Sequence, residues 1–387
     1  MDPNETPIGD RTRALTRRQL GRIALGGAVG ATLFNGASPS SASVRPQSPG
    51  IKLAIAGRAN PSDEDILFLK QLGIGYVFCA VTPEFNSVEG LQQIKKRYSD
   101  AGITVHDVRN MAVTTDLTDV VLGRPGRDQK IEDFKAWLRT AGRAGFPYTV
   151  AAFFAVGVLQ TGWAAERASQ TRDFDLASPN LSLMGAPNGN PGAAPPLKPV
   201  GASNSPVFGR QYTRDEIWEN YTYFIKQVAP VAEEEGITIG FHPDDPPVLE
   251  LFGVPRLLSS FAGYKRALEI ANSPNVGLCL CCGTWAEGGA AMGMDPGEAV
   301  RYFGAQKKIF EIHYRNVSSP LPHFHETAMD DGYYDMYKIM KALVDVKYDG
   351  IVHLDHPVPM TGGEKTYTAY AVGYMRAQLQ RAQAEKS

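Results

Sequence analysis

Hydrophobic and polar positions follow two alternating patterns from residue 51 onwards. Short apolar runs rich in β-branched residues are typical of buried strands, and longer segments with one apolar face are typical of helices. The short runs predict eight strands, at residues 51–56, 75–81, 103–108, 148–156, 237–240, 276–282, 308–317 and 351–355. The longer segments predict helices at residues 63–72, 87–101, 131–144, 213–236, 264–271, 296–303, 336–346 and 367–384.

This regular alternation predicts a parallel (β/α)₈ barrel, the TIM barrel, formed by residues 46–387 as one catalytic domain. The main alternative is an open doubly wound sheet. Such a sheet usually carries a glycine-rich phosphate-binding turn after its first strand, and residues 56–59, Ala-Gly-Arg-Ala, are not such a turn. The pattern therefore favours the barrel.

One segment, residues 161–211, interrupts the alternation after the fourth predicted strand. Its middle is rich in glycine and proline, as in Gly185-Ala-Pro-Asn-Gly-Asn-Pro-Gly192, so we predict irregular structure. A loop of this length is usually a lid, a binding loop or a linker. Because it follows a strand end, we expect a loop over the site, with a mobile linker as an equal alternative for its middle.

The first 45 residues have the order of a secretory signal. Arg17 and Arg18 precede an apolar run at residues 23–34, and small residues follow up to Ala42. The arginine pair predicts export by the twin-arginine route, with cleavage near Ala42 and a periplasmic or extracellular protein. The alternative is an uncleaved membrane anchor, but the run is short and glycine-rich for a membrane span. We expect no stable membrane span after cleavage.

Charge and cysteine content narrow the class of protein further. The net charge is −2, and the chain has no long basic run that would neutralise nucleic-acid phosphates. Of the four cysteines, Cys279, Cys281 and Cys282 share one predicted strand, where neighbouring side chains point to opposite faces. This spacing is poor for disulfide bonds, and it suggests another role for these cysteines.

The ends of four consecutive predicted strands carry residues of metal-ligand type. They are His242, Cys281, His313 and Asp355. In a barrel of this kind the site is built where the strands end, so we expect these side chains to meet. Two imidazoles, a thiolate and a carboxylate are ligands for a divalent transition metal, and the thiolate argues against calcium.

Three cysteines lie close together in the sixth predicted strand, so one of them must be chosen as the candidate ligand. Cys279 and Cys281 share a strand face, and Cys281 is nearer the strand end, so we predict Cys281 as the ligand and Cys279 as a deeper core residue. We expect Cys282 to point to the outer layer. Taken singly, each candidate ligand has an ordinary structural explanation, but four at successive strand ends make that explanation improbable.

Several motifs in this half of the chain resemble those of the mannonate dehydratases, a family of xylose-isomerase-like barrels. The resemblance is good over residues 212–355 and weaker before them. The most specific motif is His242-Pro243-Asp244-Asp245-Pro246-Pro247. The others, in family order, are Trp218-Glu219-Asn220, Leu280-Cys281-Cys282-Gly283, His313-Tyr314-Arg315-Asn316, Phe324-His325-Glu326, Asp335-Met336-Tyr337 and Asp355-His356.

The resemblance implies a metal-dependent enzyme that removes water from D-mannonate to give 2-keto-3-deoxy-D-gluconate. It implies that the four strand-end residues bind Mn²⁺ or Fe²⁺ and that His356 is an acid/base group. The expected binding partner is thus a small sugar acid. The sequence does not determine whether the chain forms a homo-oligomer. For substrate contacts, we expect Arg315 to clamp the carboxylate or, with equal weight, to pair with Glu311. Hydroxyl contacts are expected from Asp244, Asn316 and His325.

The chain departs from the family pattern after His356. Family members continue with glycine and then a tyrosine, a second acid/base candidate, whereas here Pro357 follows and Tyr367 is the nearest tyrosine. Two other functions stay open. One is a sugar isomerase or epimerase, which would usually need two acidic groups or a lysine facing the substrate. The other is an exported sugar-acid binding protein without turnover, which the missing tyrosine favours.

Overall fold

The structure is a computed structural model that describes residues 50–184 and 198–385 of the 387-residue chain. The predicted export signal at residues 1–45 and the proline-rich centre of the predicted loop, residues 185–197, lie outside the described residues.

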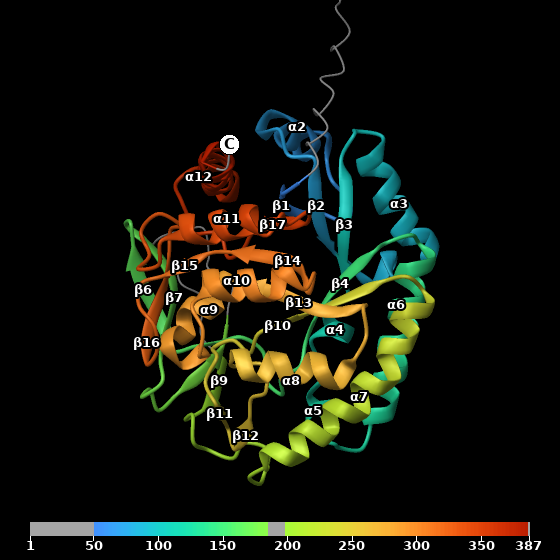
Figure 1. Cartoon of the computed structure of the whole chain (residues 1–387), viewed down its shortest axis with the longest axis vertical. Helices are drawn as coiled ribbons and strands as arrows, with labels where there is room; N and C mark the ends of the chain where they lie inside the picture. Colours follow the sequence, from blue (N-terminus) through green and yellow to red (C-terminus); the bar gives the residue numbers. More distant parts are fainter. Residues whose placement is uncertain (1–49, 185–197, 386–387) are drawn as a thin grey trace, which may run out of the picture. The chain divides into compact units, whose positions relative to one another are not determined.

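Eight parallel strands form the centre of the described chain (Figure 1). Their order in the sheet is β3-β2-β1-β17-β14-β13-β10-β4, and the edge strands β3 and β4 meet where Thr149 Oγ1 donates a hydrogen bond to the Val108 carbonyl at 3.0 Å. The predicted barrel is therefore confirmed. The eight strands are β1 (Lys52–Gly57), β2 (Tyr76–Ala80), β3 (Thr104–Arg109), β4 (Tyr148–Ala152), β10 (Thr238–His242), β13 (Val276–Cys281), β14 (Ile309–Tyr314) and β17 (Ile351–Leu354).

Eight long helices follow these strands and cover the barrel, close to the predicted positions. Local sequence sets several of their ends: Ser62 and Thr213 each make a capping box with an acidic residue three positions later, and Gly73 ends its helix in the left-handed conformation. The helices are α2 (Asp63–Leu72), α3 (Val88–Ser99), α6 (Arg127–Arg143), α7 (Arg214–Glu234), α8 (Phe261–Ala271), α10 (Pro296–Ala305), α11 (Met336–Asp345) and α12 (Glu364–Ala384).

Shorter elements fill the connections at the C-terminal ends of the strands. The helix α9 (Cys282–Gly288) starts directly after β13, with Cys281 as its N-cap. The others are α4 (Met111–Thr114), α5 (Thr118–Val121), the 3₁₀ turns Pro83–Phe85 and Gly289–Met292, and the strands β11 (Glu250–Leu251), β12 (Val254–Pro255), β15 (Asn316–Val317) and β16 (His323–Thr327).

The prediction of irregular structure over residues 161–211 is wrong for much of that segment. It contains β6 (Gly162–Glu166), β7 (Ser169–Asp175), β8 (Leu181–Leu183) and β9 (Lys198–Gly201), and β5 (Leu159–Gln160) precedes it. β6 and β7 form a hairpin whose two-residue turn, Arg167-Ala168, has positive φ at both positions. Such turns usually contain asparagine or glycine, so the sequence lacked the normal signal.

The hairpin extends a second sheet beside the barrel. Its strand order is β15-β16-β7-β6, and Figure 1 shows the labels of these strands together on one side of the molecule. Because β16 is placed between β14 and α11 in sequence, this sheet ties the segment after β4 to the loop after β14. The insertion therefore reaches the end of the barrel at which metal-ligand residues were predicted.

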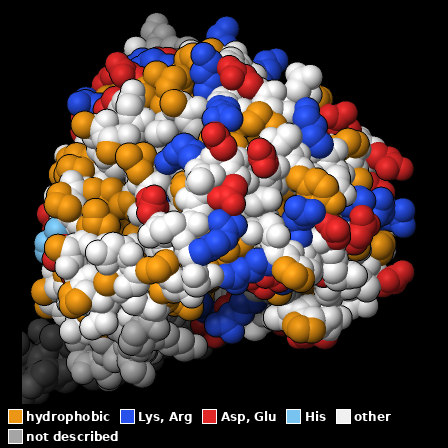
Figure 2. Space-filling model, turned by 90° about the horizontal axis from the view of Figure 1, so that it is seen from below, with side chains coloured by type: hydrophobic (Ala, Val, Ile, Leu, Met, Phe, Trp, Pro, Cys, Tyr) orange, Lys and Arg blue, Asp and Glu red, His pale blue; other side chains and the backbone are white. Residues whose placement is uncertain are grey.

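The surface carries charges of both signs. Figure 2 shows Lys and Arg side chains interspersed with Asp and Glu side chains over one face. Among the described residues, no helix is long and apolar enough to cross a membrane.

Candidate metal centre and active-site pocket

The four predicted metal ligands meet at the C-terminal end of the barrel. His242 ends β10, Cys281 ends β13, His313 lies in β14 and Asp355 directly follows β17. One ligand atom from each lies within 4.8 Å of the others, which is compatible with a single ion between them. Strand register produces this arrangement, because Cys281 is paired with His313 on the neighbouring strand.

The two histidines are oriented by their protein contacts. His242 Nδ1 lies 2.8 Å from the Pro243 carbonyl, to which it donates, so Nε2 is left for an ion. His313 Nε2 lies 3.3 Å from Glu311 Oε2, and its Nδ1 faces Asp355 Oδ2 at 3.6 Å. Within the described part of the chain this buried Nδ1 has no hydrogen-bond partner. A buried nitrogen without a partner, next to a carboxylate and a thiol, fits a metal ligand.

The environment of Cys281 favours the thiolate that metal binding needs. Burial raises the pKa of this thiol, but the Arg315 guanidinium and the nearby imidazoles of His242 and His313 outweigh burial and bring the pKa well below its ordinary value. The Thr284 backbone N–H also donates to its sulfur at 3.4 Å. The donor set therefore suits a divalent transition ion.

The other cysteines lie where they were predicted, although Cys279 also forms a second group of possible metal ligands with Glu311 and His313. Cys279 is buried one layer deeper, with its sulfur 3.8 Å from Glu311 Oε2. Cys282 begins α9 and packs in the apolar core, and burial raises the pKa of its thiol well above the ordinary value. All four cysteines, including Cys79, are free.

A layer of buried charge lies directly beneath the four ligands. Both Glu311 oxygens are 2.9 Å from the Arg109 guanidinium, and the Tyr148 hydroxyl donates to Glu311 at 3.1 Å. Arg109, not Arg315, is therefore the salt-bridge partner of Glu311. The sequence analysis missed Arg109, although its position at the end of β3 was a signal of the same kind as the others.

Arg315 is occupied by protein carboxylates. It donates to Asp355 at 3.0 Å, to Glu287 at 2.7 Å and to Asp245 at 2.7 Å, and it is 3% exposed. Because these contacts use most of its donors, neither role predicted for it, substrate clamp or partner of Glu311, fits the structure. Instead, Arg315 fixes the carboxylate of a candidate metal ligand.

Two of the expected substrate contacts face the protein interior. Asp244 accepts a hydrogen bond from the Leu258 backbone N–H at 2.7 Å and pairs with Arg256. The Asn316 amide donates to two backbone carbonyls and accepts from the Val317 backbone N–H. Both side chains are buried and held by protein groups, so we leave them out of the substrate contacts that we propose. The third, His325, is partly exposed on β16, with its Nε2 3.9 Å from Glu166.

His356 is turned towards the metal centre by its backbone and its neighbours. Its φ of 43° is rare for a non-glycine residue and occurs here at a candidate catalytic position. Its Nδ1 lies 2.6 Å from Glu326 Oε1, and its Nε2 lies 3.8 Å from Asp355 Oδ1. Burial lowers the pKa of His356, but the charges of Asp355 and Glu326 outweigh burial and raise it to about 9.

Tyr367, the alternative acid/base candidate, is placed elsewhere. It lies on α12, is 1% exposed and lines a small cavity of about 110 Å³ together with Arg167 and Val358. Burial raises the pKa of its hydroxyl above the ordinary value. The structure therefore does not bring Tyr367 together with the four candidate ligands.

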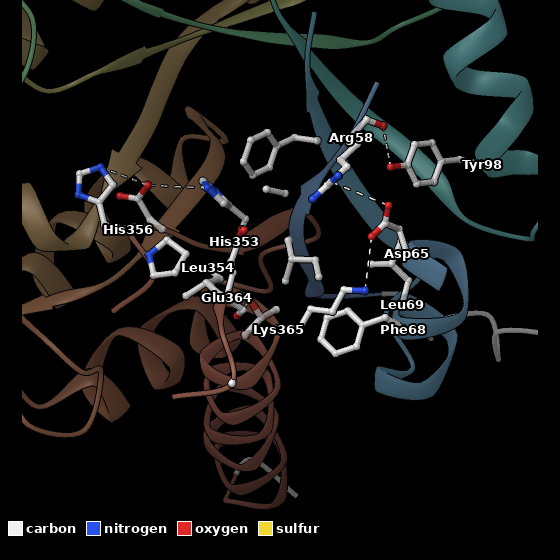
Figure 3. Close-up of a pocket in the computed structure, with 18 residues that line it drawn as sticks. Arg58, Asp65, Phe68, Leu69, Tyr98, His353, Leu354, His356, Glu364 and Lys365 are labelled. Carbon is white, nitrogen blue, oxygen red and sulfur yellow. Dashed lines mark hydrogen bonds and ion pairs between the residues drawn. The ribbon is translucent and has the colours of Figure 1, made fainter. Parts of the chain in front are cut away.

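A larger cavity of about 650 Å³ opens beside Asp355 and His356. Figure 3 shows His353 and His356 at one end of it and Arg58, Asp65 and Lys365 at the other. Apolar side chains of β1, α2 and β17 form the wall between these ends. The cavity is thus lined by an acid/base candidate and a candidate metal ligand at one end and by charged groups at the other.

A cluster of buried charged residues that the sequence analysis did not select surrounds Arg172. Arg172 of β7 is 1% exposed and contacts the carboxylates of Asp245, Glu287 and Glu326. Glu326 and Asp245 stood within recognised motifs, but Arg172 lay in a segment predicted to be irregular. Its pairing depends on the register between β7 and β16, which no local pattern revealed.

Comparison with known proteins gives one consistent result. The family model described as D-mannonate dehydratase (UxuA) matches residues 208–380. A protein of Halalkalibacterium halodurans named mannonate dehydratase 2 is 30% identical over 302 residues, which cover 75% of this chain and 83% of that protein. The mannonate dehydratase of Thermotoga neapolitana is 28% identical over 321 residues, covering 79% of this chain and 86% of that protein.

A solved structure supports the fold. The crystal structure of mannonate dehydratase from Streptococcus suis serotype 2 superposes with a TM-score of 0.72 at 23% sequence identity, and the match covers 88% of this chain and 95% of that one. It shares the barrel described above.

Proposed function

We infer that this chain, which belongs to the mannonate dehydratase family, removes water from D-mannonate to give 2-keto-3-deoxy-D-gluconate. The observation that carries this function is the grouping of His242, Cys281, His313 and Asp355. Of these four, Asp355 lines a cavity of about 650 Å³ together with His356, whose Nε2 lies 3.8 Å from Asp355 Oδ1. A six-carbon acid fits such a volume.

The reaction needs a proton removed from C2 and a hydroxyl lost from C3. The C2 proton is weakly acidic because it lies beside a carboxylate. When bound by the four ligands, a divalent ion would supply the positive charge that stabilises the enediolate formed by proton loss. We propose Mn²⁺ or Fe²⁺ for this position, since thiolate and imidazole ligands suit such ions.

The residues of the chain provide the remaining steps. His356 Nε2 faces the cavity side of Asp355, where an imidazole can give a proton to the departing C3 hydroxyl or take one from C2. Loss of water leaves an enol, which becomes the 2-keto acid when C3 gains a proton and the C2 hydroxyl loses its proton. Arg58 and Lys365 at the far end of the cavity are within its lining and can meet hydroxyls of the substrate.

The assay that tests this function incubates metal-loaded protein with a panel of hexonates and hexuronates. Formation of a 2-keto-3-deoxy acid from D-mannonate is the expected result. An absence of this product from every acid in the panel would exclude the dehydratase function.

A specific observation keeps a second function in view. Among the described residues that line the cavity with His356, the only tyrosine is Tyr98, and Tyr367 is buried in a different cavity. A sugar-acid binding protein that keeps the metal but lacks turnover would have this composition. Calorimetry with the same panel separates the two, because tight binding without a keto product favours the binding protein.

For localisation, we propose export by the twin-arginine route. The support is the sequence alone, in which Arg17 and Arg18 precede the apolar run at residues 23–34. Replacing both arginines with lysine should leave the protein in the cytoplasm, because the route requires the arginine pair. Cell fractionation measures this, and export of the lysine variant at the wild-type level would contradict the proposal.

A further inference from the structure

We propose that Glu326 is a positioning residue that holds the His356 imidazole in one orientation and one tautomer for proton transfer, an inference that rests on the proposed dehydratase function. Glu326 lies on β16, outside the barrel sheet, and is 6% exposed. Its Oε1 is 2.6 Å from His356 Nδ1. The opposite ring nitrogen, Nε2, is directed towards Asp355 Oδ1 at 3.8 Å.

The charge state of Glu326 determines which nitrogen keeps its proton when the His356 imidazolium gives one up. Burial raises the pKa of this carboxyl, but His356, Arg315 and Arg172 outweigh burial and hold it below the ordinary value. An ionised carboxylate only accepts hydrogen bonds, so His356 Nδ1 must be the donor. Nε2 is then the nitrogen that exchanges a proton with the substrate, on the side of the ring that faces the metal centre.

Glu326 is itself held in place from two sides. Arg172 Nη1 donates to its Oε1 at 3.2 Å, and Arg315 Nη1 lies 3.6 Å from the same oxygen. The Thr171 hydroxyl donates to its backbone carbonyl at 2.6 Å. The β6–β7 hairpin thus contributes two of the three supports of Glu326, those from Arg172 and Thr171. Through Glu326, the segment inserted after β4 acts on His356 without contacting it.

The contact between His356 and Glu326 depends on the left-handed backbone conformation of His356. With φ at 43°, the ring leaves the line of β17 and reaches Glu326 on the neighbouring sheet. A histidine that only filled space would not require an unfavourable backbone and a short contact to a buried carboxylate. The arrangement therefore points to orientation of the imidazole as the role of Glu326.

The kinetic test uses Glu326→Gln in the full-length metal-loaded protein. We expect kcat for D-mannonate to fall by about 10- to 100-fold, a cost comparable with losing other groups that orient a functional histidine. KM and metal content should stay near wild type, because Glu326 contacts neither the metal ligands nor the cavity. In a His356→Asn background, Glu326→Gln should lower kcat no further, since its target is gone.

Glu287→Gln is the matched control. Glu287 contacts the same two guanidinium groups, Arg172 at 3.1 Å and Arg315 at 2.7 Å, but the structure places no contact between it and His356. The factor by which Glu287→Gln lowers kcat should therefore be the same whether His356 is present or replaced by asparagine. If Glu326→Gln behaves in this additive way as well, or turns over like wild type, its role is only to stabilise the charged cluster and the proposal fails.

A measurement on the wild-type chain needs neither a variant of Glu326 nor turnover. In ¹⁵N-histidine-labelled protein loaded with diamagnetic Zn²⁺, the His356 signals are assigned by their loss in His356→Asn. We expect Nδ1 to carry a proton that is shifted downfield by a short hydrogen bond. An unprotonated Nδ1 overturns the positioning role even if D-mannonate is dehydrated. A protonated, hydrogen-bonded Nδ1 supports it even if the assay for dehydration is negative, so the two failures are distinguishable.

Discussion

Replacing His356 with asparagine should lower kcat for dehydration of D-mannonate by roughly 10²–10⁴-fold, the usual contribution of a general acid or base. Asparagine keeps much of the size and some of the hydrogen bonding to Glu326, but it cannot exchange a proton near neutral pH. Because His356 is not among the four ligands that face one another, metal content should stay near that of wild type. Steady-state assay of the keto acid and metal analysis of the same sample measure both quantities.

His323→Asn serves as the matched control for this variant. His323 also lies beside a carboxylate, 2.9 Å from Asp173, but it is 60% exposed on β16 and does not line the cavity. Its replacement should change kcat little. Wild-type turnover by His356→Asn would show that another group carries the proton. A loss of metal along with activity would show that His356 acts mainly on the metal centre.

Replacing His313 or Cys281 with alanine should reduce bound transition metal from about one ion per chain to a small residual amount, as expected for one four-ligand site. Each variant removes one ligand from a buried group whose remaining charged members already pair with other protein groups. In particular, Arg315 would keep its contacts with Asp355 and oppose the binding of a cation at a three-ligand site. Elemental analysis of protein loaded and then dialysed measures the effect.

Cys282→Ala is the control for the metal prediction. Cys282 follows Cys281 directly and has a similar burial, yet it points into the apolar core. It should bind metal as wild type does. Full metal occupancy in both His313→Ala and Cys281→Ala would exclude the centre described here. Loss of metal in Cys282→Ala as well would indicate local unfolding and not the removal of a ligand.

The predicted barrel and the predicted ligand set have the same origin in the sequence. In a parallel sheet every strand ends at the same side, so a residue's place at a strand end determines which other residues it can meet. His242, Cys281, His313 and Asp355 could therefore be grouped from strand limits accurate to a few residues. An error of one residue in a strand would have pointed a ligand out of the barrel, as the choice between Cys281 and Cys282 illustrates.

The contacts of charged residues could not be assigned in this way. Arg315 has several carboxylates within the reach of a long side chain, and the sequence offered Glu311, two positions away, as the nearest partner. The structure pairs Glu311 with Arg109, which is 202 positions distant, because β3 and β14 face each other across the barrel interior. Burial then drives each charge to its nearest opposite charge, and the distribution depends on the whole barrel.

The sequence by itself determined the barrel and the residues at its strand ends, because both follow from periodicity and short-range order. Only the tertiary structure decided the partners of Arg172, Glu326 and His356. These three residues come from an inserted hairpin, a strand outside the barrel and a left-handed position after β17. Their meeting depends on the register between β7 and β16, which forms from backbone pairing between segments about 150 residues apart and leaves no periodic trace in the sequence.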